Sequence, residues 1–531
     1  MSETFRVLIA DQLSPRAEEI LRAEQGFEVI NRPGISREDL LRAMPQVDAL
    51  LVRSATQVDD AVLGAGERLK VVARAGIGVD NVDLGNASRR GILVVNAPDG
   101  NVITTAEHTV ALLFSLARKV PAAVSSVKSG KWERNRFVGS ELHAKTLGVV
   151  GLGRIGSAVA QLARGIGMNV LAYDPYISSD AAAKRGVKLV SFDEVLAQSD
   201  YITLHVPKTP ETESLIGSEE IARMKKGVRI INCARGGLMD EAALAAALDA
   251  GRVAGVAMDV YSKEPPEAGH PLIGRDDVVC TPHLGASTAE AQENVAISAA
   301  DQVVAFLTKG VVRHAVNLPA LGPDVLEQIG PYLHLADRLG YFLAQLVEGG
   351  VRRLEVVYGG AQEVPIGPLS ASGLKGFLSK FLSGARVNLV NGPLLAKERG
   401  IEVVASTRSG TTMYTNLIEL KAATGEGERS VAGALVREGE PRIVQIDHFS
   451  VDVTPEGYML VFTNEDRPGM IGMIGTLLGS HQINIAGMQL GRTKMSPRAV
   501  AVLALDDPIP DEVMEKIRSI PNIYDAKLVR L

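Results

Sequence analysis

The chain has 531 residues, more than a single hydrophobic core can organise, so we expect several domains. Apolar residues make up 46% and charged residues 22%, an ordinary globular balance that argues against a disordered chain. The net charge of −6 argues against a nucleic-acid partner, because binding to a phosphate backbone requires a basic face.

The two cysteines, Cys233 and Cys280, are too few for a disulfide framework or a cysteine metal site, and we expect no bound metal. The N-terminus, MSETFRVLIAD, enters a strand pattern without the features of a targeting segment. No apolar stretch reaches the 18 or more residues typical of a membrane span. These observations predict a cytoplasmic protein with no membrane partner.

Short apolar runs alternate with helical patterns up to about residue 310, which predicts parallel sheets with crossover helices. The runs are FRVLIAD, DALLVRS, KVVARAG, GILVVNA, LGVVGLG, NVLAYD, YITLHV, VRIINCA, VAGVAMDV and VVCTPH. A long apolar helix over 104–120 leads to a second unit, and an amphipathic helix over 288–310 returns to the first. We predict two doubly wound α/β domains, one formed by residues 1–98 and 286–317 and one by residues 99–285.

The regular alternation of strand and helix patterns ends near Asn317, where NLPALGP is typical of a linker. Residues 318–452 mix two helical stretches with β-rich segments, which predicts an α+β domain. The last part, residues 457–531, has the order strand, helix, strand, strand, helix, strand. This βαββαβ order predicts a small ferredoxin-like regulatory domain.

The first expected site follows the apolar strand LGVV, where Gly151, Gly153 and Gly156 form a G-x-G-x-x-G turn before a helical pattern. Such glycines allow a pyrophosphate to approach the helix N-terminus. The next strand ends in Asp174, whose carboxylate can accept hydrogen bonds from a ribose 2′-hydroxyl and would repel a 2′-phosphate. NAD is therefore favoured over NADP, while a glycine turn without a nucleotide is the alternative.

Three further strand-end segments supply groups suited to hydride transfer between a hydroxy acid and NAD. Arg235 follows VRIINCA and can grip a carboxylate in bidentate fashion. Glu264 follows VAGVAMDV, and His283 follows VVC. Glu264 can raise the pKa of the histidine and fix its tautomer, which makes His283 the stronger acid/base candidate.

Each of these residues has an ordinary alternative as a surface ion pair, a loop charge or a satisfied polar group, and their joint placement favours a site. His108 lies in a helical pattern and His205 ends a strand. Both are open to a structural reading or to a place along the cofactor cleft.

The segments GLGRIG, CARGG, DVYSKEPP and TPHLGAST resemble the D-isomer-specific 2-hydroxy-acid dehydrogenases. The likeness covers the whole chain, since VRSAT, RAGIGVDNVD and VVNAPDGNVITTAEH are similar to the substrate-binding domain of a long form of that family. The middle block resembles the intervening domain of the long form, and the C-terminal block resembles an ACT domain. The resemblance implies a substrate domain (1–98 and 286–317) and an NAD-binding domain (99–285).

Residue by residue, the resemblance implies that His283 is the proton donor and acceptor, Glu264 its partner and Arg235 the cation that orients the substrate. The NAD contacts that it implies are Ile77, Gly151, Gly153, Arg154, Ile155, Gly156, Asp174, Val206, Cys233, Ala234, Arg235, Asp259, His283, Gly285 and Ala286. Val206 stands where related sequences often have threonine. The implied substrate contacts are Arg53, Ser54, Arg74, Gly76 and Asn101, with Arg134 reaching a neighbouring subunit's site.

The activity implied by the long form is oxidation of 3-phospho-D-glycerate to 3-phosphohydroxypyruvate by NAD, the entry step of serine synthesis, in a homo-oligomer, expected to be a tetramer. A side reduction of 2-oxoglutarate is also implied. Asp466 and Asn484 resemble the residues that receive an effector, L-serine, at an ACT dimer interface, while Asn464 stands where some relatives carry tyrosine. The alternatives are a dehydrogenase of an unphosphorylated acid, such as glycerate or lactate, and an NAD-sensing protein or corepressor.

Overall fold

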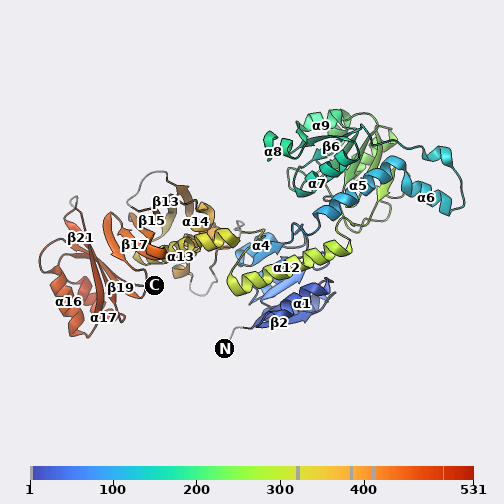
Figure 1. Ribbon diagram of the computed structural model, residues 1–531. Helices are drawn as coiled ribbons and strands as arrows, with labels where there is room; N and C mark the ends of the chain where they lie inside the picture. The colour runs from blue at the N-terminus through green and yellow to red at the C-terminus, as the bar shows by residue number, and fades with distance from the viewer. Residues whose placement is uncertain (1–3, 319–322, 383–386, 409–413, 494–495) are drawn as a thin grey trace.

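The computed structural model describes residues 4–318, 323–382, 387–408, 414–493 and 496–531 (Figure 1). The chain folds around four sheets within these ranges. Two of the sheets are parallel, one is mixed and the last is antiparallel. The first two sheets position the candidate active site.

The first sheet is parallel and has the order β2-β1-β3-β4-β5. Its strands are β1 (Phe5–Ile9), β2 (Phe27–Asn31), β3 (Ala49–Val52), β4 (Val71–Arg74) and β5 (Leu93–Asn96). The helices around it are α1 (Pro15–Ala23), α2 (Arg37–Ala43), α3 (Asp60–Ala65), α4 (Leu84–Arg89) and α12 (Ala289–Lys309). Alternate residues of β1 enter two hydrophobic clusters, Val7 and Ile9 on one face and Leu8 on the other, because neighbouring strand residues point to opposite faces.

The long helix α12 belongs to the core of this first sheet, although all strands of the second sheet lie between the two in sequence. Val295, Ala299 and Val303 of α12 pack in the same cluster as Val7 and Ile9, and α12 lies beside α1 (Figure 1). The chain therefore leaves the first unit after β5 and returns to it through α12.

The second sheet is parallel and has the order β12-β11-β10-β9-β6-β7-β8. Its strands are β6 (Thr146–Val150), β7 (Asn169–Tyr173), β8 (Lys188–Leu189), β9 (Tyr201–Leu204), β10 (Val228–Asn232), β11 (Val253–Met258) and β12 (Val278–Cys280). The helices of this unit are α5 (Val102–Arg118), α6 (Val120–Lys128), α7 (Arg154–Gly165), α8 (Ser179–Lys184), α9 (Phe192–Gln198), α10 (Ser218–Arg223) and α11 (Glu241–Asp249). The strand order reverses between β6 and β9, the switch point at which open α/β sheets bind ligands.

The third sheet is mixed and has the order β14-β13-β15-β16-β17-β18. Its strands are β13 (Val351–Gly360), β14 (Glu402–Thr407), β15 (Asn416–Thr424), β16 (Glu428–Val436), β17 (Glu440–Ile446) and β18 (Phe449–Val453). Helices α13 (Pro323–Leu346), α14 (Ile366–Phe381) and α15 (Gly392–Glu398) belong to this unit. Gly340 and Gly376 allow α13 and α14 to lie close together, because a Cβ at either position would overlap backbone atoms of the other helix.

The C-terminal sheet is antiparallel, with the order β20-β21-β19-β22. It is formed by β19 (Tyr458–Glu465), α16 (Met470–Ser480), β20 (Ile485–Arg492), β21 (Arg498–Leu505), α17 (Asp511–Arg518) and β22 (Ile523–Arg530). One face packs on α16 and α17 through residues such as Leu460 and Phe462. Met459 and Val461 face the other way and join the core of the mixed sheet, so these two units share one hydrophobic cluster.

The predicted fold class is confirmed: two doubly wound parallel sheets, then an α+β unit and a βαββαβ unit. The prediction missed β2 and β8, which are the edge strands of their sheets. The helix predicted over 104–120 is divided at Lys119, whose φ of 54° is left-handed, and the chain continues as α6. Three helices rather than two occur among the described residues of 318–452, because α15 is only seven residues long.

No single helix in the described ranges is long and apolar enough to cross a membrane. The pair α5 and α6, which meet at 65°, passes that test of length and composition only when taken together. The packing of α5 explains its apolar composition, because Leu112, Leu113 and Leu116 are buried in the core of the second sheet.

Candidate active site

The glycine turn at residues 151–156 lies between β6 and α7, at the switch point of the second sheet. Gly151 has a φ of 91°, which favours glycine, and a Cβ at Gly156 would overlap the carbonyl oxygen of Gly151. A Cβ at Gly153 would meet no heavy atom within 4 Å. The first and third glycines therefore close the turn, and the second leaves open space before the helix N-terminus, where a pyrophosphate would lie.

Asp174 lies directly after β7 and contacts the glycine turn. Its Oδ2 accepts a hydrogen bond from the backbone N–H of Leu152 at 2.8 Å, and its Oδ1 accepts one from Tyr176 at 2.9 Å. The carbonyl oxygen of Leu152 accepts a hydrogen bond from Arg185 at 2.6 Å. The carboxylate is thus held at the end of β7 beside the turn, as a ribose contact requires.

Other predicted cofactor contacts lie along the same edge of the sheet. Arg154 begins α7 and pairs with Asp99 at 3.1 Å, while Val206 is partly buried after β9. Burial lowers the pKa of His205 to about 4, so this imidazole is neutral, and its Nε2 lies 3.0 Å from Thr203 Oγ1. Burial also raises the pKa of the Cys233 thiol to about 12. These two side chains are suited to a structural place in the cleft wall.

The three residues singled out for the chemistry follow three adjacent strands of the second sheet. Arg235 follows β10, Glu264 follows β11 and His283 follows β12. Asn232 at the end of β10 fixes the turn before Arg235, because it accepts from Ala234 N–H at 3.0 Å and donates to the carbonyl of Arg235 at 2.8 Å. The fold therefore gathers the three segments at one edge.

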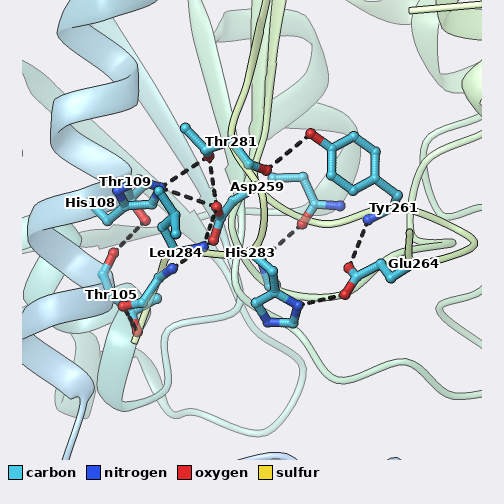
Figure 2. Close-up of polar contacts among 12 residues, drawn as sticks. Thr105, His108, Thr109, Asp259, Tyr261, Glu264, Thr281, His283 and Leu284 are labelled. Carbon is cyan, nitrogen blue, oxygen red and sulfur yellow. Dashed lines mark hydrogen bonds and ion pairs between the residues drawn. The ribbon is translucent and has the colours of Figure 1, made fainter. Parts of the chain in front are cut away.

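His283 and Glu264 are in direct contact (Figure 2). His283 Nδ1 lies 2.7 Å from Glu264 Oε2, and Glu264 Oε1 accepts from the backbone N–H of Tyr261 at 3.0 Å. Burial alone would raise the pKa of Glu264, but the hydrogen bonds from His283 and Tyr261 outweigh it, and the pKa lies below its ordinary value. Glu264 is therefore an ionised partner that holds the proton of His283 on Nδ1 and leaves Nε2 free.

The backbone around His283 is held by Asp259, a fully buried carboxylate after β11. Asp259 Oδ1 accepts from Thr281 Oγ1 at 2.7 Å and from Leu284 N–H at 2.7 Å, and Oδ2 accepts from Gly285 N–H at 2.8 Å. Burial acts to raise the pKa of Asp259, but hydrogen bonds led by that of His108 keep it below its ordinary value. The carboxylate is thus charged and shared among the residues on both sides of His283 (Figure 2).

Arg235 extends from the second unit to a loop of the first. Its Nε lies 3.0 Å from Asp80 Oδ2, and its Nη1 donates to the carbonyl of Ala234 at 2.7 Å. A side chain at Gly78 would overlap this guanidinium, so the glycine is needed for the approach. The Arg235 side chain therefore spans the space between the two parallel-sheet units.

Two more predicted cations lie on the first unit. Arg74 ends β4, and its Nε donates to the carbonyl of Arg53 at 3.2 Å. Burial, with repulsion from Arg235 and Arg53, lowers the pKa of Arg74 to about 10, so it is still charged at neutral pH. Asp11 fixes the Arg53 backbone, accepting from its N–H at 2.6 Å. Arg74 is thus close enough to both Arg53 and Arg235 to be repelled by them, an arrangement chemically suited to an anion with several negative charges.

The other predicted substrate contacts differ in their surroundings. Asn101 precedes α5 and is buried, and its Oδ1 has no hydrogen-bond partner within the described part of the chain. Gly76, with a φ of 151°, has no room for a side chain beside Arg74. Ser54 is exposed, and so is Arg134, which lies in a short 3-10 helix (Arg134–Phe137).

The predicted effector residues lie apart from this site, in the C-terminal unit. Asp466 follows β19 and pairs with Arg492 of β20, whose Nε donates to Oδ2 at 2.7 Å. Asn484 donates to Asp506 at 2.7 Å. Asn464 is buried, and its Oδ1 has no hydrogen-bond partner among the residues described.

The sequence did not single out Tyr261, Thr281, Asn232 or Asp80. Tyr261 donates its hydroxyl proton to the carbonyl of Thr281 at 3.0 Å while its own N–H binds Glu264. The contacts of Tyr261 and Asn232 are to backbone groups, which a search for reactive side chains does not find. Their position directly at strand ends is the one signal that could have found them.

Comparison with family models places three parts of the chain. Residues 110–285 match the NAD-binding domain of D-isomer specific 2-hydroxyacid dehydrogenases. Residues 328–447 match the intervening domain of D-3-phosphoglycerate dehydrogenase, and residues 458–522 match the ACT domain.

Relatives similar over the full length carry one name. A D-3-phosphoglycerate dehydrogenase of Synechocystis sp. is 46% identical over 99% of this chain and 95% of its own length. Those of Archaeoglobus fulgidus and Bacillus subtilis are 45% and 42% identical over 99% of this chain and 100% of their own.

Solved structures resemble the N-terminal part. A glyoxylate reductase from Paecilomyes thermophila has a TM-score of 0.55 and 30% identity, covering 60% of this chain and 99% of that one. A D-lactate dehydrogenase from Aquifex aeolicus, complexed with NAD and lactic acid, has a TM-score of 0.52 and 29% identity, covering 59% and 100%. The two parallel-sheet units therefore match whole dehydrogenases, and the two C-terminal units are additional.

Proposed function

This chain belongs to the D-3-phosphoglycerate dehydrogenase family of D-isomer-specific 2-hydroxyacid dehydrogenases, and we propose that it oxidises 3-phospho-D-glycerate to 3-phosphohydroxypyruvate with NAD, the first step of L-serine synthesis. The observation that carries the proposal is the contact between His283 Nδ1 and Glu264 Oε2, which are 2.7 Å apart. These two residues follow β12 and β11, and Arg235 follows the next strand of the sheet, β10. A base, its charged partner and a carboxylate clamp lie on one sheet edge beside the glycine turn.

The roles of the three residues follow from their contacts. Arg235 holds the substrate carboxylate with Nη2 and with the second N–H of Nη1, because Asp80 engages Nε and Ala234 engages the other N–H of Nη1. His283 takes the proton of the C2 hydroxyl on Nε2, and Glu264 stabilises the imidazolium that results. The glycine turn would hold NAD, which would supply the acceptor for the hydride from C2. In the reverse direction His283 returns the proton to the carbonyl oxygen.

The substrate's phosphate is assigned to the first unit. Arg53 and Arg74 supply guanidinium groups, and the repulsion of Arg74 by Arg53 and by Arg235 favours a ligand that carries both a carboxylate and a phosphate. Ser54, Gly76 and Asn101 complete this assignment, and Asn101 is supported by its buried Oδ1, which has no hydrogen-bond partner among the residues described.

The proposed NAD contacts surround the glycine turn and the strand ends that follow it. Asp174 supports NAD over NADP, because its carboxylate at the end of β7 would repel a 2′-phosphate. The proposed set is that given from the sequence, namely Ile77, Gly151, Gly153, Arg154, Ile155, Gly156, Asp174, Val206, Cys233, Ala234, Arg235, Asp259, His283, Gly285 and Ala286.

The decisive experiment is NADH oxidation with phosphohydroxypyruvate, compared with glyoxylate and 2-oxoglutarate. We expect the highest kcat/KM for phosphohydroxypyruvate and a loss of about 1,000-fold or more in His283→Ala, because the acid/base group is removed. His143→Ala is the control, since His143 is an exposed histidine of the same unit. Activity with none of the three acids would contradict the proposal, as would an active His283→Ala variant or a preference for an unphosphorylated acid.

The C-terminal unit is proposed as the site of feedback by L-serine, with Asp466 and Asn484 as ligands across a dimer of ACT units. The ion pair between Asp466 and Arg492 bears on this proposal, because a serine ammonium has to compete with the guanidinium for the same carboxylate. Serine titration of the NADH assay is the test, and Asp466→Ala should abolish any inhibition while leaving kcat unchanged.

A homo-oligomer, as a tetramer, is proposed on the evidence of an exposed apolar face. Val120, Val124 and Val127 of α6, with Trp132 and Val138 nearby in the chain, are 44–80% exposed. Burial of such a face against a second copy would bring Arg134 towards the neighbouring subunit. A cytoplasmic location is likewise proposed, and the two unpaired cysteines support a reducing compartment.

The division of the chain into residues 1–98 with 286–317, 99–285, 318–452 and 457–531 is proposed on the evidence of the four sheets. Three of them fall within one of these parts, and the mixed sheet extends one residue beyond 452, because β18 ends at Val453. The packing of α12 on the first sheet supports the discontinuous first domain.

A further inference from the structure

Helix α5 carries two polar side chains that contact the loop of His283 from the side opposite Glu264 (Figure 2). Thr105 Oγ1 donates to the carbonyl of Gly285 at 2.9 Å. His108 Nε2 lies 3.2 Å from Asp259 Oδ1 and 3.2 Å from Thr281 Oγ1. Neither residue touches the His283 imidazole, so any effect on it must pass through the backbone.

We propose that His108 is a positioning residue for the reaction, which acts through Asp259 to fix the backbone on both sides of His283. The inference rests on the proposed function, because it concerns the acid/base group assigned there. It adds a residue of α5, the helix that connects the two parallel-sheet units, to the groups on which catalysis depends.

The hydrogen bonds around Asp259 determine the tautomer of His108. The Thr281 hydroxyl donates its one proton to Asp259 Oδ1 at 2.7 Å, and a carboxylate only accepts. Nε2 of His108 can bond to either atom only if it carries a proton itself. His108 is therefore a donor at Nε2, and it supports the carboxylate oxygen that also receives the N–H of Leu284.

The backbone of His283 needs this support. Its φ of 55° is left-handed, a conformation that is strained in a residue other than glycine and persists only where the surroundings impose it. The flanking residues are fixed on both sides, Thr281 through its side chain and Leu284 and Gly285 through their N–H groups. All three bonds converge on Asp259, so a displaced carboxylate would release the loop on both sides at once.

The consequence for the reaction is a loss of alignment rather than of binding. A misplacement of about 1 Å of a catalytic group costs roughly 100-fold in rate. Arg235, Arg53 and Arg74 lie on other segments and hold the substrate independently of this loop. Loss of the His108 donor should therefore lower kcat and leave the KM for the 2-oxo acid nearly unchanged.

The test compares His108→Leu, His108→Asn and His108→Gln with wild type in the NADH assay with phosphohydroxypyruvate. Leucine removes the donor, asparagine carries an amide nitrogen too close to the main chain to replace Nε2, and glutamine restores a donor near Nε2. We expect kcat to fall about 10-fold to 100-fold in the Leu and Asn variants, with KM within about threefold of wild type, and to recover largely in the Gln variant. Glu107→Gln, an exposed neighbour on α5, is the matched control and should behave as wild type.

A second measurement does not depend on turnover. Hydrogen exchange of the peptide covering 281–288 should become faster in His108→Leu and in His108→Asn, but not in His108→Gln or Glu107→Gln, because the N–H groups of Leu284 and Gly285 lose protection. The asparagine variant keeps the comparison available if leucine prevents folding.

The inference is overturned by unchanged kcat and exchange in both His108→Leu and His108→Asn, by equal losses in the Gln and Leu variants, or by a loss confined to KM. A wild-type protein that reduces none of the 2-oxo acids would instead contradict the proposed function, and hydrogen exchange would then decide whether His108 holds the loop.

Discussion

Asp259 shows how a single buried carboxylate can organise a reaction site without being the reacting group. Its charge is compensated by donors from α5, from Thr281 and from the backbone of Leu284 and Gly285. Unpaired donors in such a place are costly, since a buried group left without its partner costs about 1 to 3 kcal/mol.

We expect Asp259→Asn to lower the free energy of unfolding of the NAD-binding unit by about 3 kcal/mol at pH 7, because an amide nitrogen would face N–H donors. Urea unfolding followed by circular dichroism measures the change. The control is Asp301→Asn, which alters an exposed carboxylate on α12 and should change stability by less than about 0.5 kcal/mol.

The same substitution has a predictable pH dependence. The pKa of Asp259 in the folded protein lies below its ordinary value of 3.8, so its contribution to stability is fully present above that value and is lost as the pH falls through the folded-state pKa. The difference in stability between wild type and Asp259→Asn should therefore be constant from about pH 7 to pH 5 and shrink at lower pH. A difference that grows on acidification would contradict this assignment.

Motifs in the sequence indicate which strand ends carry charged groups, and the fold then decides which of them meet. The segments KEPP and TPHLG pointed to Glu264 and His283, which lie 2.7 Å apart. The contribution of Tyr261 was not predictable, because it binds through its own N–H and to the carbonyl of Thr281. Such contacts use backbone N–H and carbonyl groups, which nearly every residue has, so the residue type does not indicate which of them will be used.

At the scale of elements, the turn between β6 and α7 contains one glycine that is needed for packing and one that leaves space for a ligand. Gly156 is needed for packing, since a Cβ would overlap the carbonyl oxygen of Gly151, whereas the space around Gly153 is open. The difference allows the stability of the turn and its affinity for a dinucleotide to be varied separately.

Gly156→Ala should destabilise the unit by about 1 to 3 kcal/mol and abolish NADH binding, because the methyl group displaces the turn. Gly153→Ala should leave the melting temperature of the ligand-free protein unchanged, since its φ of −69° suits alanine, and should raise the KM for NADH at least about 10-fold. Thermal melting with and without NADH distinguishes the two. Equal melting temperatures for both variants would contradict the assignment.

The elements missed from the sequence share a physical cause. Strands β2 and β8 are at sheet edges and receive less burial, as in β2, where Val29 is the only fully buried residue. The central strands are buried on both faces and appear as continuous apolar runs. A pattern of hydrophobicity therefore predicts the well-buried strands of a parallel sheet, including the edge strands β5 and β12, and misses edge strands with little burial, such as β2 and β8.

For the whole molecule, the order of the four units was predictable from the alternation of strands and helices in the sequence. The packing of the C-terminal unit against the mixed-sheet unit was not predictable. Met459 and Val461 of β19 pack in the core of the mixed sheet. The side-chain amide of Gln345 of α13 donates to the carbonyl of Arg530 and accepts from its N–H. No short sequence pattern indicates contacts between residues that are so far apart in the chain. The ACT unit is thus part of a larger C-terminal body.

A truncation series tests this arrangement. We expect residues 1–317 to fold and to reduce phosphohydroxypyruvate, because the solved D-lactate dehydrogenase from Aquifex aeolicus matches 59% of this chain over 100% of its own. Residues 1–455 should be less stable than the full chain and prone to aggregation, because removal of the ACT unit exposes Val451 and Val453 with their neighbours. Melting temperature and light scattering measure both effects. A 1–455 protein as stable as the full chain would show that the shared core contributes little.

The chain has a single tryptophan, Trp132. The Trp132 residue is 80% exposed and follows the exposed apolar residues of α6 in the chain. This arrangement makes self-association visible without a label, because indole emission moves to shorter wavelength when the ring leaves water. Dilution of the unmodified protein, followed at the tryptophan emission maximum, would give the dissociation constant of the assembly directly. The signal comes from one known position, so a shift on concentration would also identify the face of α6 as the one through which copies of the chain associate.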